Sequence, residues 1–269
     1  MKLQRISRLF FGLVSGVLVL NLGLLLAIRT AQDSIERAVH RAEAAHAEVD
    51  EMVQGTELLA SLVQGYATTA RTSYLDLYYE ILGVWQGERR SPEVSSQVAY
   101  WRQRIGDAES APAPAAAGEP RSMIDRLRAL DFTAQELQAA QAVLDGIAAL
   151  QVEEKIAFAA TQGLYDRQSQ QFIDEGPPDR AYAIERVHSP HYDNLRAGLI
   201  RAVGRLSSEV ERRTSAELDS ARRGLNLAVL SALFANLLML PLAAVAVVVM
   251  RRRVLQPIGA LVRTAGHFA

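Results

Sequence analysis

Aromatic side chains gather in a short stretch of the sequence, and an arginine lies at its edge. The residues that we single out as candidate ligand contacts are Arg71, Tyr74, Tyr78 and Trp101, with Tyr79, Trp85 and Tyr100 in the same aromatic patch. Aromatic rings supply apolar walls with polar tips, and a guanidinium can hold a carboxylate through two parallel hydrogen bonds. One interpretation is therefore a pocket for a small organic ligand. The alternative, which we favour, is that these rings pack a small subdomain against longer helices.

Polar residues also occupy helical seams that are otherwise apolar. His46 lies on one seam, and Gln151 and Glu154 lie on another. Polar seam residues commonly fix the register of packed helices, and this is the interpretation that we favour. An imidazole titrates near physiological pH, so pH sensing by His46, or by His188 and His191, is the alternative.

The residue types exclude several classes of function. The 269 residues carry a net charge of −1, without the basic surface that a nucleic-acid binder needs. Cysteine is absent, which removes disulfides and thiolate metal sites. The sequence shows no paired carboxylates, nucleophile elbow, glycine-rich phosphate loop or histidine spacing for a metal. We therefore predict no catalytic residue, cofactor or metal within this chain.

Two apolar segments bracket the polar middle of the chain. Residues 10–28 and 225–250 contain no charged side chain, and each is long enough to cross a hydrocarbon core of roughly 30 Å as a helix. The first is longer than the apolar part of a cleaved signal peptide, so we predict a retained anchor. Basic residues favour a cytoplasmic location for residues 1–9 and for the residues after 250, with 29–224 outside. These residues are Lys2, Arg5, Arg8, Arg251, Arg252 and Arg253.

The polar region carries three long helical patterns, and we see no alternating strand pattern. The first seam alternates steps of four and three residues from Ile35 to Val63. Thr133 and Glu136 form the sequence signature of a capping box, which begins a second helix whose seam we extend through Tyr165 to Phe172. Ser189-Pro190 begins a third helix, with no helix breaker before the second apolar segment.

Between the first two long helices the pattern changes. Residues 73–86 and 93–105 are predicted to form two short helices joined by a turn at residues 87–92. Residues 107–120 are rich in alanine and proline and are predicted to form a flexible linker. The expected fold is all-α: an antiparallel helical bundle outside the membrane, with a small helical subdomain, between two transmembrane helices.

The segment after the second apolar run resembles the first amphipathic helix of a HAMP linker. Pro257 follows the apolar run, and apolar residues then recur at helical spacing. The positions that match are Pro257, Ile258, Leu261, Ala265 and Phe268. The resemblance implies a signal linker in residues 251–269, of which the connector and second helix lie beyond the sequence. It also implies a homodimer, because Ile258, Leu261 and Phe268 need partner helices to become buried.

Residues 29–224 resemble the helical sensor domains of bacterial chemoreceptors and hybrid histidine kinases. The stretches that carry this likeness are residues 74–82, Tyr100-Trp101 and residues 130–137. The resemblance implies a receptor input module in the bacterial inner membrane. It would sense a small molecule or a periplasmic binding protein, and its kinase or chemotaxis output would lie beyond Ala269. The alternative is a two-span membrane adaptor without an output domain.

Overall fold

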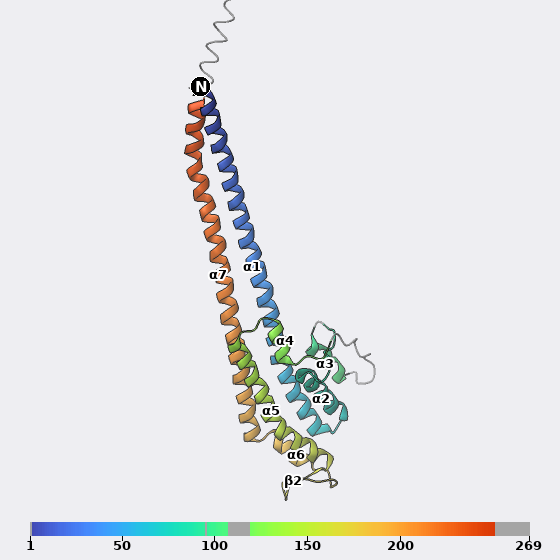
Figure 1. Ribbon diagram of the computed structural model, residues 1–269. Coiled ribbons are helices and arrows are strands. Elements are labelled where there is room, and N and C mark those ends of the chain that lie inside the picture. The colour runs from blue at the N-terminus through green and yellow to red at the C-terminus, as the bar shows by residue number, and fades with distance from the viewer. Residues whose placement is uncertain (1, 95, 107–118, 251–269) are drawn as a thin grey trace, which may run out of the picture. The chain divides into compact units, whose positions relative to one another are not determined.

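The computed structural model describes residues 2–94, 96–106 and 119–250, and it is predominantly helical (Figure 1). Two very long helices, α1 (Lys2–Thr69) and α7 (Pro190–Met250), bracket all the other elements in the sequence. These are α2 (Thr72–Gln86), α3 (Gln97–Gly106), α4 (Met123–Ala129), α5 (Ala134–Gln162), β1 (Tyr165–Asp166), β2 (Gln171–Phe172) and α6 (Arg180–Val187). The helical fold class is therefore confirmed. The signal-linker residues Pro257, Ile258, Leu261 and Phe268, and most of the predicted flexible linker 107–120, lie outside the described residues.

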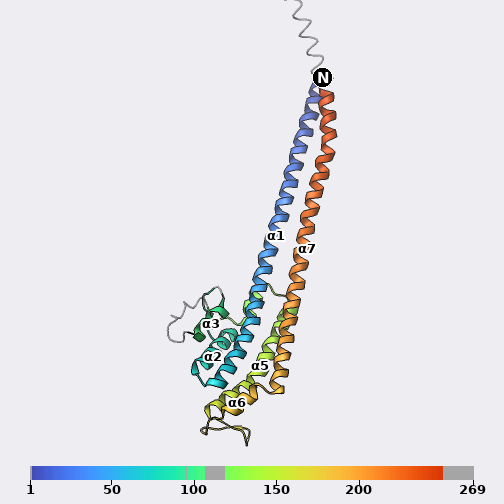
Figure 2. The same ribbon diagram turned by 180° about the vertical axis from the view of Figure 1, so that it is seen from behind.

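The chain divides into two compact units, and α1 and α7 contribute to both. The helix-pair unit comprises residues 1–40 and 215–269, and the bundle unit comprises residues 41–214. In the helix-pair unit, two described segments of α1 and α7 run side by side (Figures 1 and 2). The side-chain amide of Asn21 donates to the carbonyl oxygen of Val17 at 3.2 Å and approaches the sulfur of Met239 at 3.8 Å. The Asn21 amide lies within the apolar segment of α1, and both of these polar contacts are made inside the helix-pair unit.

Both helices of this pair have the length and composition of a membrane span. Windows of mean hydropathy 1.8 and 1.7 occur in α1 and α7, and none of their residues is buried within the protein. Large apolar side chains stand exposed along both, among them Leu18, Leu22, Leu227 and Phe234. Exposed apolar surface of this extent is typical of segments that contact lipid or another protein.

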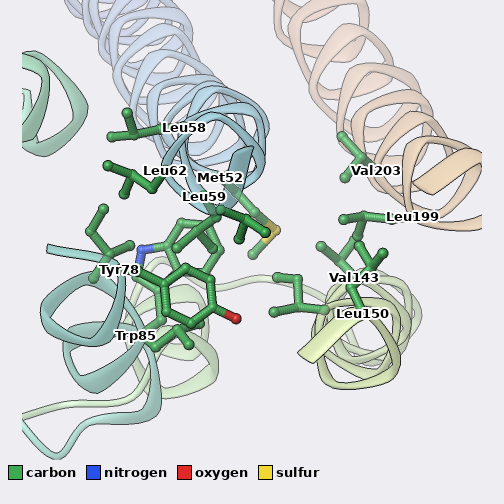
Figure 3. Close-up of a cluster of buried hydrophobic side chains, with 14 of the residues drawn as sticks. Met52, Leu58, Leu59, Leu62, Tyr78, Trp85, Val143, Leu150, Leu199 and Val203 are labelled. Carbon is green, nitrogen blue, oxygen red and sulfur yellow. The ribbon is translucent and has the colours of Figure 1, made fainter. Parts of the chain in front are cut away.

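The bundle unit packs segments of α1 and α7 around α2, α4 and α5. Cross-helix contacts fix the directions: Glu136 and Glu154 of α5 meet Arg213 and Tyr192 of α7, respectively, so α5 and α7 are antiparallel. Gln162 at the end of α5 bonds to Tyr66 near the end of α1, so these two helices are parallel. Figure 3 shows Met52, Leu59, Tyr78 and Trp85 meeting Val143, Leu150, Leu199 and Val203 in one apolar core.

One close approach sets the spacing of α1 and α2. A Cβ atom on Gly55 would lie 2.3 Å from the Trp85 ring, so only glycine leaves room for the indole there. Trp85 is 2% exposed as a result. The contact between Gly65 and Tyr74 is similar but less close, because a Cβ added at Gly65 would lie 3.1 Å from the Tyr74 ring. These contacts place α2 along α1, with Tyr78 and Trp85 buried and Tyr79 exposed.

The seam predicted for α1 is correct in part. Ala42, Val49 and Val63 are buried, as the pattern predicts, but Val53 and Thr56 are only half-buried. The structure buries Ala45, Met52, Leu58, Leu59 and Leu62 as well. The reason is that α1 packs against other helices on more than one side, so its buried face is wider than the narrow stripe of a coiled coil.

The capping box of α5 is confirmed, but the predicted end of this helix is wrong. The Thr133 hydroxyl accepts from the Glu136 amide, and the Glu136 carboxylate accepts from the Thr133 amide. The helix ends at Gln162 because Gly163 adopts a left-handed conformation with φ 77°, and its amide bonds back to the last turn. Tyr165 and Phe172, which we assigned to the seam, instead pair across the short antiparallel hairpin β1–β2.

The shorter helices are partly as expected. α2 matches the predicted helix at residues 73–86, and α3 begins at Gln97, later than the predicted residue 93. Two helices escaped prediction: α4, capped by Ser122, and α6, capped by Asp179. Both are too short to show a clear apolar period. The predicted start of the third long helix is confirmed, since α7 begins at Pro190 and the Ser189 hydroxyl accepts from the Tyr192 amide.

Candidate functional site

A buried carboxylate lies at the centre of the bundle unit. Glu154 of α5 follows Ile147 and Leu150 along the same inward face, and its side chain is 4% exposed. Tyr192 of α7 donates its hydroxyl to Oε1 at 2.8 Å, and Tyr78 of α2 donates its hydroxyl to Oε2. The carboxylate therefore joins three helices that are far apart in the sequence.

The surroundings of Glu154 oppose its ionisation. Burial raises the pKa of the Glu154 carboxyl group, although the two tyrosine donors and the positive charge of Arg196 act in the opposite direction. Burial also raises the pKa of Tyr78 and of Tyr192, and the neighbouring carboxylate raises both further. The tyrosines consequently stay protonated over the physiological pH range and remain hydrogen-bond donors.

Aromatic rings hold this polar centre from the α2 side. The rings of Tyr78 and Phe158 meet edge to face with centroids 5.1 Å apart, and Tyr66 meets Phe158 at 5.4 Å in the same manner. Tyr79 lies against Tyr78 at 5.3 Å. Edge-to-face contacts of this kind fix ring orientation. They therefore keep the Tyr78 hydroxyl in position to donate its hydrogen bond to Glu154.

A cleft between α1, α5 and α7 reaches Glu154 from the surface. We call it the Glu154 cleft; its lining residues are Thr56, Glu57, Leu59, Ala60, Ile147, Leu150, Glu154, Arg196, Leu199 and Ile200. Its volume is about 110 Å³, which exceeds the space that one ordered water requires. Charges of both signs face it: the carboxylates of Glu154 on α5 and Glu57 on α1, and the guanidinium of Arg196 on α7. The arrangement can bind a small polar molecule, but it offers no nucleophile paired with a base.

A second cleft, of about 370 Å³, lies where α2, α4 and α5 meet. Leu82, Trp85, Ile124, Leu144 and Ile147 provide most of its wall. Its polar groups, from Gln86, Ser122, Gln141 and Gln151, carry no charge. The absence of a charged or buried titratable group in this lining leaves less to orient a ligand than Glu154 and Arg196 provide.

Other buried charges of the bundle unit are internally paired. The Arg213 Nε atom lies 2.7 Å from Glu136, which also closes the capping box of α5. Glu153 forms an ion pair with Arg186 of α6 at 2.5 Å. These pairs connect helices to one another, and each charged side chain has a partner of opposite sign within the fold. They are therefore structural contacts rather than binding sites.

The structure places the four residues chosen from the sequence in different surroundings. Arg71 is exposed at the N-cap of α2 and lies over the Tyr74 ring, 5.6 Å from its centroid. Tyr78 is buried against Glu154, and Trp101 is fully buried within α3. Neither of the two clefts described above is lined by any of the four. Arg71 and Tyr74 are brought into contact, and the role of all four residues in ligand binding stays a prediction.

The histidines occupy ordinary polar contacts. His46 places Nε2 3.2 Å from the Thr214 hydroxyl and 3.3 Å from Glu211. His188 contacts the Ile184 carbonyl oxygen at 3.0 Å, and His191 lies 3.5 Å from Glu153. Their role in pH sensing stays a prediction. Among the residues that the structure describes, no cluster of His, Asp and Glu has the arrangement of a metal site.

Sequence reasoning singled out Glu154 but missed its partners. Its place on an apolar seam was a usable signal, because a charged residue there must find hydrogen bonds or neutralise. Tyr192 and Arg196, one helical turn apart on α7, carried no signal of their own. Comparisons with protein-family models, with curated proteins and with solved structures give no match for this chain.

Proposed function

We propose that this chain is the input module of a transmembrane signal receptor, which senses a ligand in the bundle unit and transmits a helix displacement across a membrane. The observation that supports this best is the continuity of α7. Tyr192 and Arg196, which contact or line the site at Glu154, belong to the same unbroken helix as the apolar segment that ends at Met250. A change at the site therefore has a stiff covalent route toward the lipid.

The second support is the character of the helix-pair unit. Its exposed apolar side chains, given above, require lipid or an equivalent cover. We propose that residues 10–28 and 225–250 cross the bacterial inner membrane. The distribution of lysine and arginine favours both termini in the cytoplasm and residues 29–224 in the periplasm. The proposal includes a homodimer and a HAMP-like signal linker in residues 251–269, followed by a histidine kinase or chemotaxis output.

The physical mechanism is a shift between two packings of the bundle. A ligand that binds one packing more tightly moves the equilibrium toward it, by no more than the difference in its two binding free energies. Because α1 and α7 each continue from the bundle unit into an apolar segment, a change in their relative position in the bundle is passed on to those segments. The displacement of α7 against α1 is the quantity that a downstream linker would read.

Cysteine labelling tests the topology. The chain contains no cysteine, so each introduced thiol is the only one present. Gln138→Cys places a thiol at an exposed position of α5, and Ser7→Cys places one before the first apolar segment. In intact spheroplasts, a membrane-impermeant maleimide should label the first variant and should label the second only after permeabilisation. The opposite pattern would contradict the proposed orientation, and extraction of the chain from membranes by carbonate would contradict the spans.

A chimeric receptor tests signalling. The chain is joined after Ala269 to the remaining linker and kinase of a characterised receptor, and kinase activity is compared between the wild type and Tyr192→Phe. The loss of one hydroxyl in the bundle should change the basal kinase activity if the chain transmits conformation. Arg201→Gln, an exposed substitution on the same helix, serves as the control and should leave the activity unchanged. Equal activity in all three chains would favour the two-span adaptor.

A further inference from the structure

We infer that the Glu154 cleft binds a small zwitterion, an aliphatic amino acid, with its ammonium group toward Glu154 and its carboxylate toward Arg196. This inference rests on the proposed sensing function and names the chemical class of the ligand. It follows from three properties of the lining: spare hydrogen-bond acceptors on α1 and α5, spare donors on α7, and an apolar remainder.

The acceptor side is formed by α1 and α5. When ionised, the Glu154 carboxylate offers about four acceptor positions, of which the two tyrosines use two, and an ammonium group beside it favours this ionised form against the effect of burial. The Thr56 hydroxyl donates its proton to the Val53 carbonyl oxygen at 2.7 Å, so toward the cleft it can act only as an acceptor. Glu57 adds a second carboxylate at the exposed rim. An ammonium group, with three donors and no acceptor, matches this side.

The donor side is Arg196 of α7. Its side chain is half-buried, and within the described part of the chain the guanidinium makes neither a hydrogen bond nor an ion pair below 4.0 Å. A guanidinium carries five N–H donors in a rigid fork that suits a carboxylate. Leaving such a group half-buried beside an apolar wall without a partner is unfavourable. A ligand carboxylate would supply that partner.

Much of the remaining lining is aliphatic. Leu59 of α1, Leu150 of α5 and Leu199 of α7 are each buried and line the cleft. A ligand with only a carboxylate would bring negative charge near Glu154 and Glu57. A ligand with only an ammonium group would lie beside Arg196. Only a zwitterion gives each charged wall a partner of opposite sign.

Calorimetric titration of the full chain in lipid nanodiscs tests the inference. L-Alanine, L-valine and L-leucine are the zwitterionic probes. Isobutylamine and 3-methylbutanoate are valine without its carboxylate and without its ammonium group, respectively. At least one amino acid should bind, and for valine both analogues should bind at least about tenfold more weakly, since each loses a charged hydrogen-bonded contact. Binding of either analogue as tightly as L-valine, or binding of none of the three amino acids, would overturn the inference.

Variants locate the two contacts. Arg196→Gln should weaken amino-acid binding about tenfold or more without weakening the binding of isobutylamine, and Glu154→Gln should weaken amino-acid binding without weakening the binding of 3-methylbutanoate. Arg201→Gln, exposed on the same helix, is the matched control and should bind like the wild type. Arg196 has no bond to lose in the fold, so its variant remains informative if the Glu154 variant is unstable. Wild-type affinity in Arg196→Gln would refute the carboxylate contact.

The chimeric receptor separates this inference from the proposed function. Binding of an amino acid that leaves kinase output unchanged would support the site and contradict the receptor role. Output that responds to Tyr192→Phe, together with no binding of any amino acid in the panel, would support the receptor role and refute the ligand class.

Discussion

Helix α5 buries two glutamates in opposite electrostatic situations. Glu136, at its first turn, is 1% exposed, and Glu154, near its end, is 4% exposed. Burial alone would raise the pKa of both carboxyl groups. For Glu136 the hydrogen bonds from Arg213 and Thr133 outweigh burial and lower the pKa, whereas for Glu154 burial prevails and the pKa is raised. Two equally buried glutamates therefore differ in role: Glu136 is held in a structural ion pair, whereas Glu154 keeps unused hydrogen-bond acceptor positions.

The difference lies in the partners that the fold provides. Glu136 receives a cation, a hydroxyl and a backbone amide, and this set leaves little capacity for a ligand. Glu154 receives two neutral hydroxyls, and its nearest cation, Arg196, acts through its charge without a hydrogen bond. A buried charge that is fully paired is costly to break, and one that is incompletely paired is available for binding. Four substitutions test this contrast.

Glu136→Gln should have the largest effect on stability. It leaves Arg213, which is only 17% exposed, without its carboxylate, and should lower the free energy of unfolding by about 3 kcal/mol. Urea unfolding of the full chain in detergent, followed by tryptophan fluorescence, measures it, because Trp85 and Trp101 are both buried in the bundle unit. The double variant Glu136→Gln, Arg213→Met should recover part of the loss. An unchanged unfolding midpoint in the single variant would show that the Glu136 ion pair does not stabilise the fold.

Tyr192→Phe should have the next largest effect. It removes a hydrogen bond to a charged or partly charged acceptor and should cost about 2 kcal/mol, by the same measurement. The ring and its packing stay in place, so the change reports on the hydroxyl alone. A loss below about 0.5 kcal/mol would mean that Glu154 is satisfied without it, which would weaken the comparison.

Glu154→Gln should differ from Glu136→Gln in the sign of its pH dependence. A carboxyl group whose pKa is raised on folding stabilises the fold below its unfolded pKa of about 4.3, and this contribution is lost as pH rises through the folded pKa. Glutamine resembles the protonated acid, so relative to the wild type this variant should gain stability as pH rises. Glu136 has a lowered pKa, so its contribution is present above about 4.3 and is lost as pH falls. Unfolding curves should therefore differ in opposite directions: the Glu154→Gln variant should gain stability relative to the wild type as pH rises above about 4.3, and the Glu136→Gln variant should approach the wild type as pH falls below about 4.3.

Glu185→Gln sets the baseline. Its ion pair with Arg167 has both side chains more than half exposed, so the change should stay within about 0.5 kcal/mol. A larger loss would show that the unfolding assay responds to surface charge in general, and the other three values would then need correction by this amount.

Features set by residues close together in the sequence were predicted correctly, whereas contacts between residues far apart in the sequence were not. The capping box at Thr133 and the start of α7 at Pro190 depend on residues within one helical turn, and both were predicted. The predicted end of α5 is wrong because Gly163 terminates the helix, although apolar residues continue at helical spacing as far as Phe172. Glu154 was noticed as a polar interruption, but the helices that bring Tyr78 and Tyr192 to it are set by tertiary packing. Nothing in a single sequence indicates which side chains meet across such distances.

The fit of Trp85 over Gly55 has a consequence for recognising distant relatives. A Cβ at position 55 would lie only 2.3 Å from the indole, so a larger residue there would force α1 away from α2, whereas a smaller residue in place of Trp85 would leave a cavity. The two positions should therefore vary together, glycine wherever the partner is tryptophan and a larger residue wherever that ring has shrunk. Such paired variation would identify homologues of low overall sequence identity, and an alignment alone would then indicate the packing of α1 against α2.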